Sequence, residues 1–278
     1  MNLSKTTSTI DYGIDLGTTN SAIASSRGGL PCIQKSDRYN KDTTPSCVSI
    51  NKKGTLNVGD DSYKELDTAR TKKNQNPNAQ TLDAYVEFKR MMGTDQTLYS
   101  ELLDEMLTPE QLSAEVLKKL KSYVKDTSII NAAVVTVPAK FENPQIDATQ
   151  KAAELAGFKY CELLQEPVAA SIAYGLSGQD IEGYWIVFDF GGGTFDAALM
   201  KVEESIIKVA DTEGDNLLGG KNIDYAIVDK IFVPWIAQNF SIESSLGDGE
   251  KKLLLRDALK QKAEETKIAF SNENCTTH

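Results

Sequence analysis

Residues 188–196 have the sequence Phe-Asp-Phe-Gly-Gly-Gly-Thr-Phe-Asp, in which three consecutive glycines lie between two aspartates and two strand-like runs. Glycine costs roughly 0.5–1 kcal/mol relative to alanine inside a regular element, so three in a row need a reason that involves the backbone. Close approach of backbone N–H groups to a phosphate is such a reason, and Asp189 and Asp196 add oxygen ligands suited to Mg²⁺ or its waters. A flexible turn is the alternative, but it needs no flanking acids. We therefore predict a phosphate-binding turn of four residues: Gly191, Gly192, Gly193 and Thr194.

A second glycine turn occurs near the start of the chain, where residues 13–21 are Gly-Ile-Asp-Leu-Gly-Thr-Thr-Asn-Ser. Gly17 allows the backbone to approach a phosphate, and the hydroxyls of Thr18 and Thr19 are additional donors. Asp15 supplies a carboxylate for a metal or its waters. Because the motif is short, an ordinary hairpin turn remains an alternative for this stretch.

Two further stretches carry weaker signals. Glu166 directly precedes a proline that starts a helix, which favours a carboxylate at a strand end facing a cleft, although an ordinary acid in a first helical turn has the same pattern. The diglycine Gly219-Gly220 leads into a helix, and a turn with an N-terminal cap explains it without any ligand.

The pattern of apolar residues predicts two strand–turn–strand units separated by helices. Such a duplicated α/β arrangement binds ligands where the strand ends of the two halves converge. A polar stretch at 60–80 is expected to be an exposed face or loop before the amphipathic residues 81–92. Strands are expected at 12–24, 47–50, 132–137, around 163, 184–190 and 195–202, and helices at 108–125, 143–156, 167–174, 222–240 and 249–271.

Composition narrows the class of protein. The chain has 278 residues, 40% apolar residues and a net charge of -10, which is typical of a soluble globular protein and argues against a nucleic-acid surface. Its amino-terminal residues are polar, and it lacks the ~20 consecutive apolar residues of a membrane span, so we expect a cytoplasmic protein with no membrane partner. The four cysteines show no metal-binding spacing, and His278 is the only histidine.

Five motifs in this order resemble the ATPase domain of the Hsp70 chaperone family, within the actin and sugar-kinase superfamily. They are GIDLGTTNS at 13–21, AVVTVPAKF at 133–141, EPVAASIAYGL at 166–176, FDFGGGTFD at 188–196 and GDNLLGG at 214–220. The resemblance implies an actin-like ATPase fold: two ribonuclease H-like lobes flanking a nucleotide cleft, with the second lobe incomplete. It places the first lobe at 1–178, with its core at 8–47 and 126–178 and an inserted subdomain at 48–125. The second lobe is expected at 179–278, with a core part at 179–218 and a partial inserted subdomain at 219–278.

Site residues follow from the same resemblance, position by position. Lys89 matches the family's lysine that reaches the γ-phosphate and the attacking water. Without the resemblance, Lys89 would be interpreted as a solvated lysine on a helix. Residues expected in catalysis are Lys89, Glu166, Asp189, Thr194 and Asp196. Residues expected to bind ATP are Gly17, Thr18, Thr19, Asn20, Gly191, Gly192, Gly193, Thr194, Gly219, Gly220, Glu264, Lys267, Ile268 and Ser271. Residues expected around the metal, mostly through water, are Asp15, Glu166, Asp189 and Asp196.

The implied function is slow, Mg²⁺-dependent transfer of the γ-phosphoryl group of ATP to water, with ATP or ADP controlling peptide binding by a separate domain. The chain is expected to stop before that domain, and the residues do not indicate which carboxylate activates water. A regulator or scaffold that binds ATP without hydrolysing it is the alternative. A small-molecule kinase would need an acceptor pocket with a base, and no motif supplies one.

Several positions depart from the family pattern. Lys140 replaces an aromatic residue, Ile146 replaces an arginine beneath the cleft, and Glu162 stands where an arginine commonly contacts the J-domain cochaperone. Charge reversal at a contact weakens binding, so we expect weak J-domain stimulation, while a nucleotide-exchange factor remains an expected partner. At the adenosine site, Ile268 replaces a stacking arginine and Lys221-Asn222 replace an acidic pair, which predicts a lower nucleotide affinity.

Overall fold

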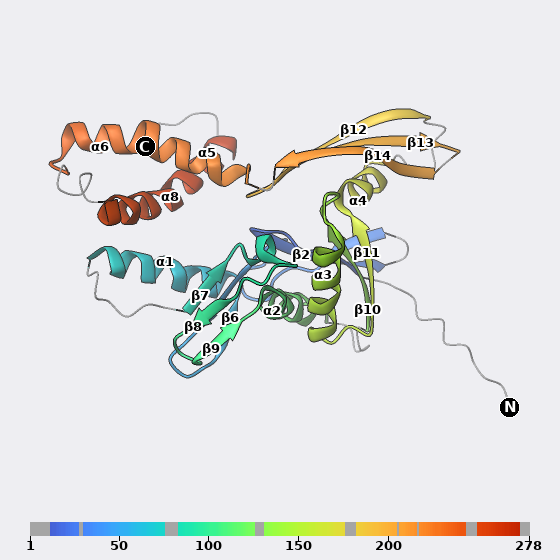
Figure 1. Ribbon diagram of the computed structural model, residues 1–278, viewed down its shortest axis with the longest axis horizontal. Coiled ribbons are helices and arrows are strands. Elements are labelled where there is room, and N and C mark those ends of the chain that lie inside the picture. The colour runs from blue at the N-terminus through green and yellow to red at the C-terminus, as the bar shows by residue number, and fades with distance from the viewer. Residues whose placement is uncertain are drawn as a thin grey trace.

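The computed structural model describes residues 12–27, 30–75, 83–125, 131–175, 182–204, 206–215, 217–242 and 249–272. They form a mixed α/β structure with two separate main sheets (Figure 1). We call the elements up to residue 175 the first lobe and those from residue 182 the second lobe. The predicted lobe boundary at residue 178 lies outside the described residues.

The main sheet of the first lobe has the order β11-β10-β1-β2-β3, with β4 added beside β2. Strands β1 and β2 form the predicted hairpin, in which Ile14 lies opposite Ile23. On its other edge β1 pairs in parallel with β10, and β10 pairs in parallel with β11. The bounds are β1 Tyr12–Asp15, β2 Asn20–Arg27, β3 Leu30–Ile33, β4 Thr44–Pro45, β10 Ala132–Val137 and β11 Tyr160–Gln165.

Three helices of the first lobe begin within one residue of their predicted starts, and α2 ends before its predicted end at residue 125. Helix α2 (Pro109–Ser122) starts with a capping box, in which the Thr108 hydroxyl accepts from the backbone N–H of Gln111 and the Gln111 side chain accepts from that of Thr108. Helix α3 (Asn143–Leu155) is followed by Gly157 with φ 81°, the left-handed geometry that ends many helices. Helix α4 (Glu166–Ala173) follows β11 directly.

The inserted part of the first lobe carries a small sheet, of which the sequence predicted only the strand at 47–50, and one helix that it did not predict. The sheet has the order β6-β5-β7, with β5 Cys47–Ile50, β6 Leu56–Val58 and β7 Asp83–Val86. The polar stretch expected to be an exposed face or loop instead forms helix α1 (Asp60–Gln75), which contacts β5 and α8. Two aspartates in its first turn favour the helix through its dipole, and tertiary contacts supply the rest. A 3₁₀ helix η1 (Phe88–Met91) and a hairpin of β8 (Leu98–Ser100) and β9 (Glu105–Leu107) complete this part.

The second lobe begins with an antiparallel sheet of order β12-β13-β14. The first two strands, β12 (Gly183–Phe190) and β13 (Phe195–Glu203), form the second predicted strand–turn–strand unit, and β14 (Ile206–Asp215) is an additional strand. Strand β13 alternates, burying Ala198, Met200 and Val202 on one face.

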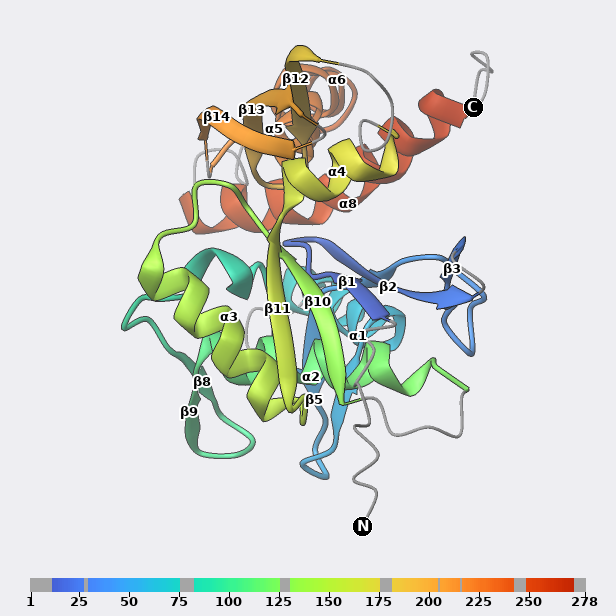
Figure 2. The same ribbon diagram turned by 90° about the vertical axis from the view of Figure 1, so that its right-hand side faces the viewer.

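Helices α5 (Gly220–Ile227), α6 (Val233–Asn239) and α8 (Gly249–Asn272) follow the second sheet. Helices α5 and α6 are joined by a π-helical turn (Val228–Phe232), in which the Val233 N–H donates to the Val228 carbonyl. Pro234 explains this widening, because proline has no N–H and its ring clashes with the carbonyl four residues before it. In the two views α8 faces the first lobe, where it contacts α1 (Figures 1 and 2).

Candidate functional site

The first glycine turn, between β1 and β2, is held by a chain of short hydrogen bonds. The Gly17 N–H donates to Ser21 Oγ at 3.1 Å, Ser21 Oγ and Ser46 Oγ share a hydrogen bond of 2.8 Å, and Ser46 Oγ donates to the Gly17 carbonyl at 2.7 Å. A Cβ atom on Gly17 would lie 2.1 Å from the carbonyl oxygen of Asn20. The turn therefore requires glycine for its own backbone geometry, and the approach of a phosphate to Gly17 stays a prediction.

The second glycine turn, between β12 and β13, is closed by a hydrogen bond from the Gly191 N–H to the Thr194 carbonyl at 2.9 Å. Its carbonyls are occupied by the start of α5: the N–H groups of Gly220 and Lys221 donate to the carbonyls of Gly191 and Gly192, each at 2.9 Å. A Cβ atom on Gly219 would lie 2.5 Å from the Gly193 nitrogen. The first glycine of the diglycine, Gly219, is thus needed for close packing of α5 against the triple-glycine turn, which goes beyond the simple cap that would explain the sequence.

The two turns face each other across the boundary between the lobes. A Cβ atom on Gly192 would lie 2.1 Å from Thr19 Oγ1. Thr18, Thr19, Gly192 and Gly220 all line one pocket, which continues between α1 and α8. Glycine at position 192 is therefore required by a contact between two lobes, whereas glycine at position 17 is required by its own turn.

Carboxylates gather at the strand ends beside these turns. Asp189 and Asp196 are directly opposite each other across β12 and β13. Asp15 ends β1 and accepts a hydrogen bond from Thr136 Oγ1 at 3.2 Å. Desolvation by surrounding atoms raises the pKa of all three carboxyls, and the charge of Glu166 raises each further, against the opposing effect of Lys89.

One carboxylate oxygen of this group lacks a hydrogen-bond donor. Asp196 Oδ1 is buried without a hydrogen-bond partner among the described residues. A buried carboxylate oxygen without a donor is costly, and a cation or a metal-bound water would satisfy it. No group of three or more His, Cys, Asp or Glu side chains in the described part of the chain is placed to hold a metal directly. The Asp196 oxygen without a donor fits Mg²⁺ or one of its waters, and the expectation that the contacts run mostly through water stays a prediction.

Lys89 is the buried cation of the site. It lies on η1 with only 7% of its surface exposed, and its Nζ is 2.9 Å from Glu166 Oε1. Glu166, in the first turn of α4, is itself largely buried in this pair, with 17% of its side chain exposed. Lys89 is thus not a solvated helix lysine, and Glu166 has a specific partner beyond the dipole of its helix.

Helix α8 supplies the far wall of the pocket. Lys267 Nζ is 2.6 Å from Asp224 Oδ1 and donates to the Gly220 carbonyl at 3.1 Å. Glu264 Oε2 accepts from Tyr63 OH at 3.2 Å and from Lys260 Nζ at 2.8 Å. Both Glu264 and Lys267 line the pocket.

Two predicted residues of α8 are not brought to that pocket. Ile268 is 52% exposed, and Ser271 donates to the Lys267 carbonyl one turn earlier; neither is among the residues that line the pocket. Asn20 is exposed at the start of β2. Their roles in nucleotide binding stay predictions.

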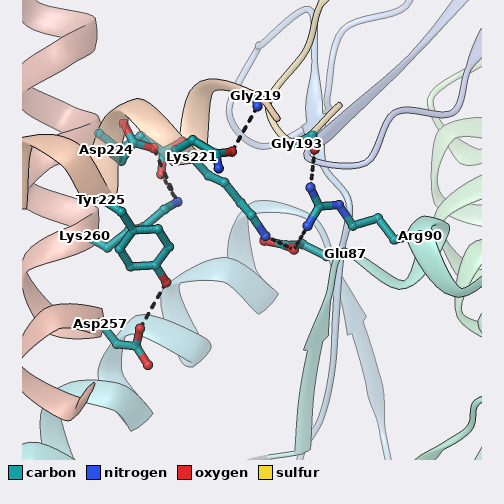
Figure 3. Close-up of polar contacts among 11 residues, drawn as sticks. Glu87, Arg90, Gly193, Gly219, Lys221, Asp224, Tyr225, Asp257 and Lys260 are labelled. Atoms are coloured by element: carbon teal, nitrogen blue, oxygen red, sulfur yellow. Dashed lines mark hydrogen bonds and ion pairs between the residues drawn. The ribbon is translucent and has the colours of Figure 1, made fainter. Parts of the chain in front are cut away.

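Sequence reasoning missed several residues of the cleft. Arg90 donates to the Gly193 carbonyl from the other lobe, and Glu87 accepts from Lys221 (Figure 3). Asp224 is 1% exposed and lies between Lys260 and Lys267. For the contacts of Asp224, the sequence held one signal: Lys260 and Lys267 are seven residues apart, which puts both lysines on one face of α8.

Comparison with known proteins identifies the family. The family described as "Hsp70 protein" matches residues 11–278. A "Chaperone protein DnaK" of Ureaplasma urealyticum serovar 10 is 36% identical over 273 residues, which cover 98% of this chain and 42% of the relative. Proteins of the same name from Mesomycoplasma hyopneumoniae strain J and Mycoplasmopsis agalactiae are each 36% identical, over 96% and 95% of this chain and 41% of each relative. The chain thus spans about two fifths of the length of these relatives.

Among the described residues, no helix is long and apolar enough to span a membrane.

Proposed function

The chain belongs to the Hsp70 family, and we propose that its cleft binds ATP or ADP with Mg²⁺ and hydrolyses ATP slowly. The observation that carries this proposal is the meeting of two glycine turns from different sheets, with three aspartates at the adjoining strand ends. Backbone N–H groups at such turns bind phosphate, and the carboxylates balance the charge of a divalent cation.

In this proposal the two turns hold the phosphates from opposite lobes. Gly17, Thr18, Thr19 and Asn20 contribute from the first lobe, and Gly191 to Thr194 from the second. The rigid hydrogen-bonded frame around Gly17 and Ser46 supports this role, because donors that are already positioned cost little reorganisation when charge develops. Glu264 and Lys267 are assigned to the adenosine end of the pocket, with Gly219 and Gly220 beside the ribose.

Asp15, Asp189, Asp196 and Glu166 would hold the metal through its waters. Bound there, Mg²⁺ supplies positive charge that neutralises the phosphate oxygens. The partnerless oxygen of Asp196 and the raised pKa of the three aspartates support this assignment, since a cation nearby would offset both the desolvation of these carboxylates and the added charge of Glu166.

Among the candidate bases for the attacking water, we favour Asp196. Glu166 is engaged by the Lys89 ammonium at 2.9 Å, whereas Asp196 Oδ1 has no donor among the described residues. Burial raises the pKa of Asp196, which makes its carboxylate a better proton acceptor than an ordinary aspartate. Lys89 then stabilises negative charge that develops on the γ-phosphate, and Thr194 orients a phosphate oxygen.

For the whole protein we propose a chaperone in which ATP state controls peptide binding by another domain. This step rests on family membership, since the chain spans about two fifths of its curated relatives. Partners would be unfolded peptide, a nucleotide-exchange factor and, more weakly because of Glu162, a J-domain protein. A cytoplasmic location stays a prediction.

A single-turnover assay tests the enzymatic proposal. We expect slow release of phosphate from ATP that requires Mg²⁺ and falls at least about 100-fold in Lys89→Ala, because a preorganised charge is lost from the transition state. Lys262→Ala, in an exposed pair on α8, is the matched control and should retain the wild-type rate. Tight ATP binding without turnover in the wild-type chain would instead indicate the non-hydrolysing regulator.

A further inference from the structure

Three charged side chains join the lobes at the pocket wall, and we call Glu87, Arg90 and Lys221 the Glu87 cluster. Glu87 Oε2 accepts from Lys221 Nζ at 2.5 Å and from Arg90 Nη1 at 3.1 Å (Figure 3). Arg90 also donates through Nη2 to the Gly193 carbonyl. Glu87 and Arg90 belong to the first lobe, and Lys221 lies in the first turn of α5 in the second lobe. The cluster therefore crosses the cleft twice.

The ion pair between Glu87 and Lys221 lies beside the glycine turns. Glu87 and Lys221 line the same pocket as Thr18, Thr19 and Gly192. The Lys221 N–H donates to the Gly192 carbonyl at 2.9 Å, so the backbone of Lys221 is bound to the triple-glycine turn of its own lobe while its side chain reaches Glu87 in the first lobe. Separation of the lobes along this wall requires the ion pair to break.

The backbone at Glu87 is unusual. Glu87 has φ 60°, a left-handed conformation that is unfavourable for a residue other than glycine. Such strain persists only where surrounding contacts maintain it, and it concentrates at functional sites. Here the strained conformation presents the carboxylate to two cations, one from each lobe.

A second ion pair between the lobes provides a comparison. Lys140 Nζ lies 2.8 Å from Glu213 Oε2, but the Glu213 side chain is 85% exposed. In the Glu87–Lys221 pair the side chains are 36% and 23% exposed. Exposed ion pairs are screened and contribute little, whereas partly desolvated pairs are stronger. Of these two ion pairs, we therefore expect only Glu87–Lys221 to control the separation of the lobes.

We propose that Glu87 and Lys221 form an ionic gate at the nucleotide pocket, which must open for ADP to leave and so sets the rate of nucleotide exchange. The inference rests on the proposed function, since it assumes a nucleotide in this pocket. It gives Glu87 a role, and it gives Lys221, so far considered only as a substitution at the adenosine site, a partner whose attraction determines how long nucleotide stays bound.

A double-mutant cycle on ADP dissociation tests the gate. The rate is measured by displacing an ADP that carries an N-methylanthraniloyl fluorophore from wild type, Glu87→Gln, Lys221→Met and the double variant. We expect each single variant to raise the rate about three- to tenfold and the double variant to raise it no further, because both remove one interaction. Lys221→Arg keeps the charge and should retain slow release, and Glu213→Gln is the control for a lobe-crossing pair outside the pocket.

Salt provides a readout that a structural role alone would not change. Raising NaCl should accelerate ADP release from wild type and have little effect on the double variant. Single-variant effects that multiply, or rates equal to wild type, would overturn the gate while leaving the proposed function intact. Titration calorimetry on the wild-type chain distinguishes failure of the gate from failure of the proposed function. If the wild-type chain bound neither ADP nor ATP, both the gate and the proposed function would be overturned.

Discussion

The two strand–turn–strand units have similar sequences but very different surroundings. In the first lobe, Ile14 on β1 is 1% exposed and packs in a continuous apolar cluster with β10, α2 and α3. In the second lobe, Ile186 on β12 is 73% exposed and Phe188 is 69% exposed. Strand β1 is paired on both edges, whereas among the described residues β12 pairs only with β13. Apolar periodicity therefore predicts a strand, while burial depends on which elements cover it.

The largest expected effect comes from truncating matched isoleucines in the two units. Ile14→Ala should lower the free energy of unfolding by about 2–5 kcal/mol, because it removes buried methyl groups and leaves a cavity. Ile186→Ala should change it by less than about 0.5 kcal/mol, since that side chain is already in water. Urea denaturation followed by circular dichroism measures both. Equal losses would mean that β12 is covered in solution.

The two glycine turns should also respond differently to an added methyl group. In Gly17→Ala the new Cβ meets backbone of its own turn, so we expect a loss of about 1–3 kcal/mol in stability. In Gly192→Ala it meets a side chain of the other lobe, and slight lobe opening relieves that contact.

Gly192→Ala should therefore keep its melting temperature and lose about tenfold in ATP affinity. Scanning calorimetry and titration calorimetry separate the two outcomes. A melting temperature that falls equally in both variants would contradict the distinction between a turn glycine and a contact glycine.

The smallest expected effect concerns Asp196. Its raised pKa means that the folded state binds a proton more tightly than the unfolded chain does, so folded stability falls as pH rises above the ordinary aspartate value of 3.8. Asp196→Asn removes the charge and should stabilise the ligand-free chain at pH 7 by on the order of 1 kcal/mol, or about 2–4 °C.

The pH dependence provides the control for that variant. Its advantage should shrink as the pH falls, because the raised pKa lets the wild-type carboxyl take up a proton before an ordinary aspartate does. Added Mg²⁺ should stabilise wild type more than Asp196→Asn. A melting temperature that decreases in the variant at pH 7 would show that the carboxylate is stabilised by its surroundings.

Local signals predicted much of the fold because their causes are local. Strand β10 (Ala132–Val137) has the predicted bounds, since a valine-rich run of that length favours a buried strand. Gly157 and Thr108 mark helix ends through their own backbone and side-chain geometry. Helix α1 was missed because its sequence is polar and its stabilising contacts come from other elements, β5 and α8, the second of which is distant in the chain.

The candidate site divides in the same way. The sequence by itself determined the two glycine turns and the carboxylates beside them, because turn geometry and strand ends depend on neighbouring residues. Only the tertiary structure decided that Lys89 pairs with Glu166, 77 positions away, and that Glu87 pairs with Lys221, 134 positions away. Periodicity contains no information about such distances, since they are set by how two lobes pack against each other.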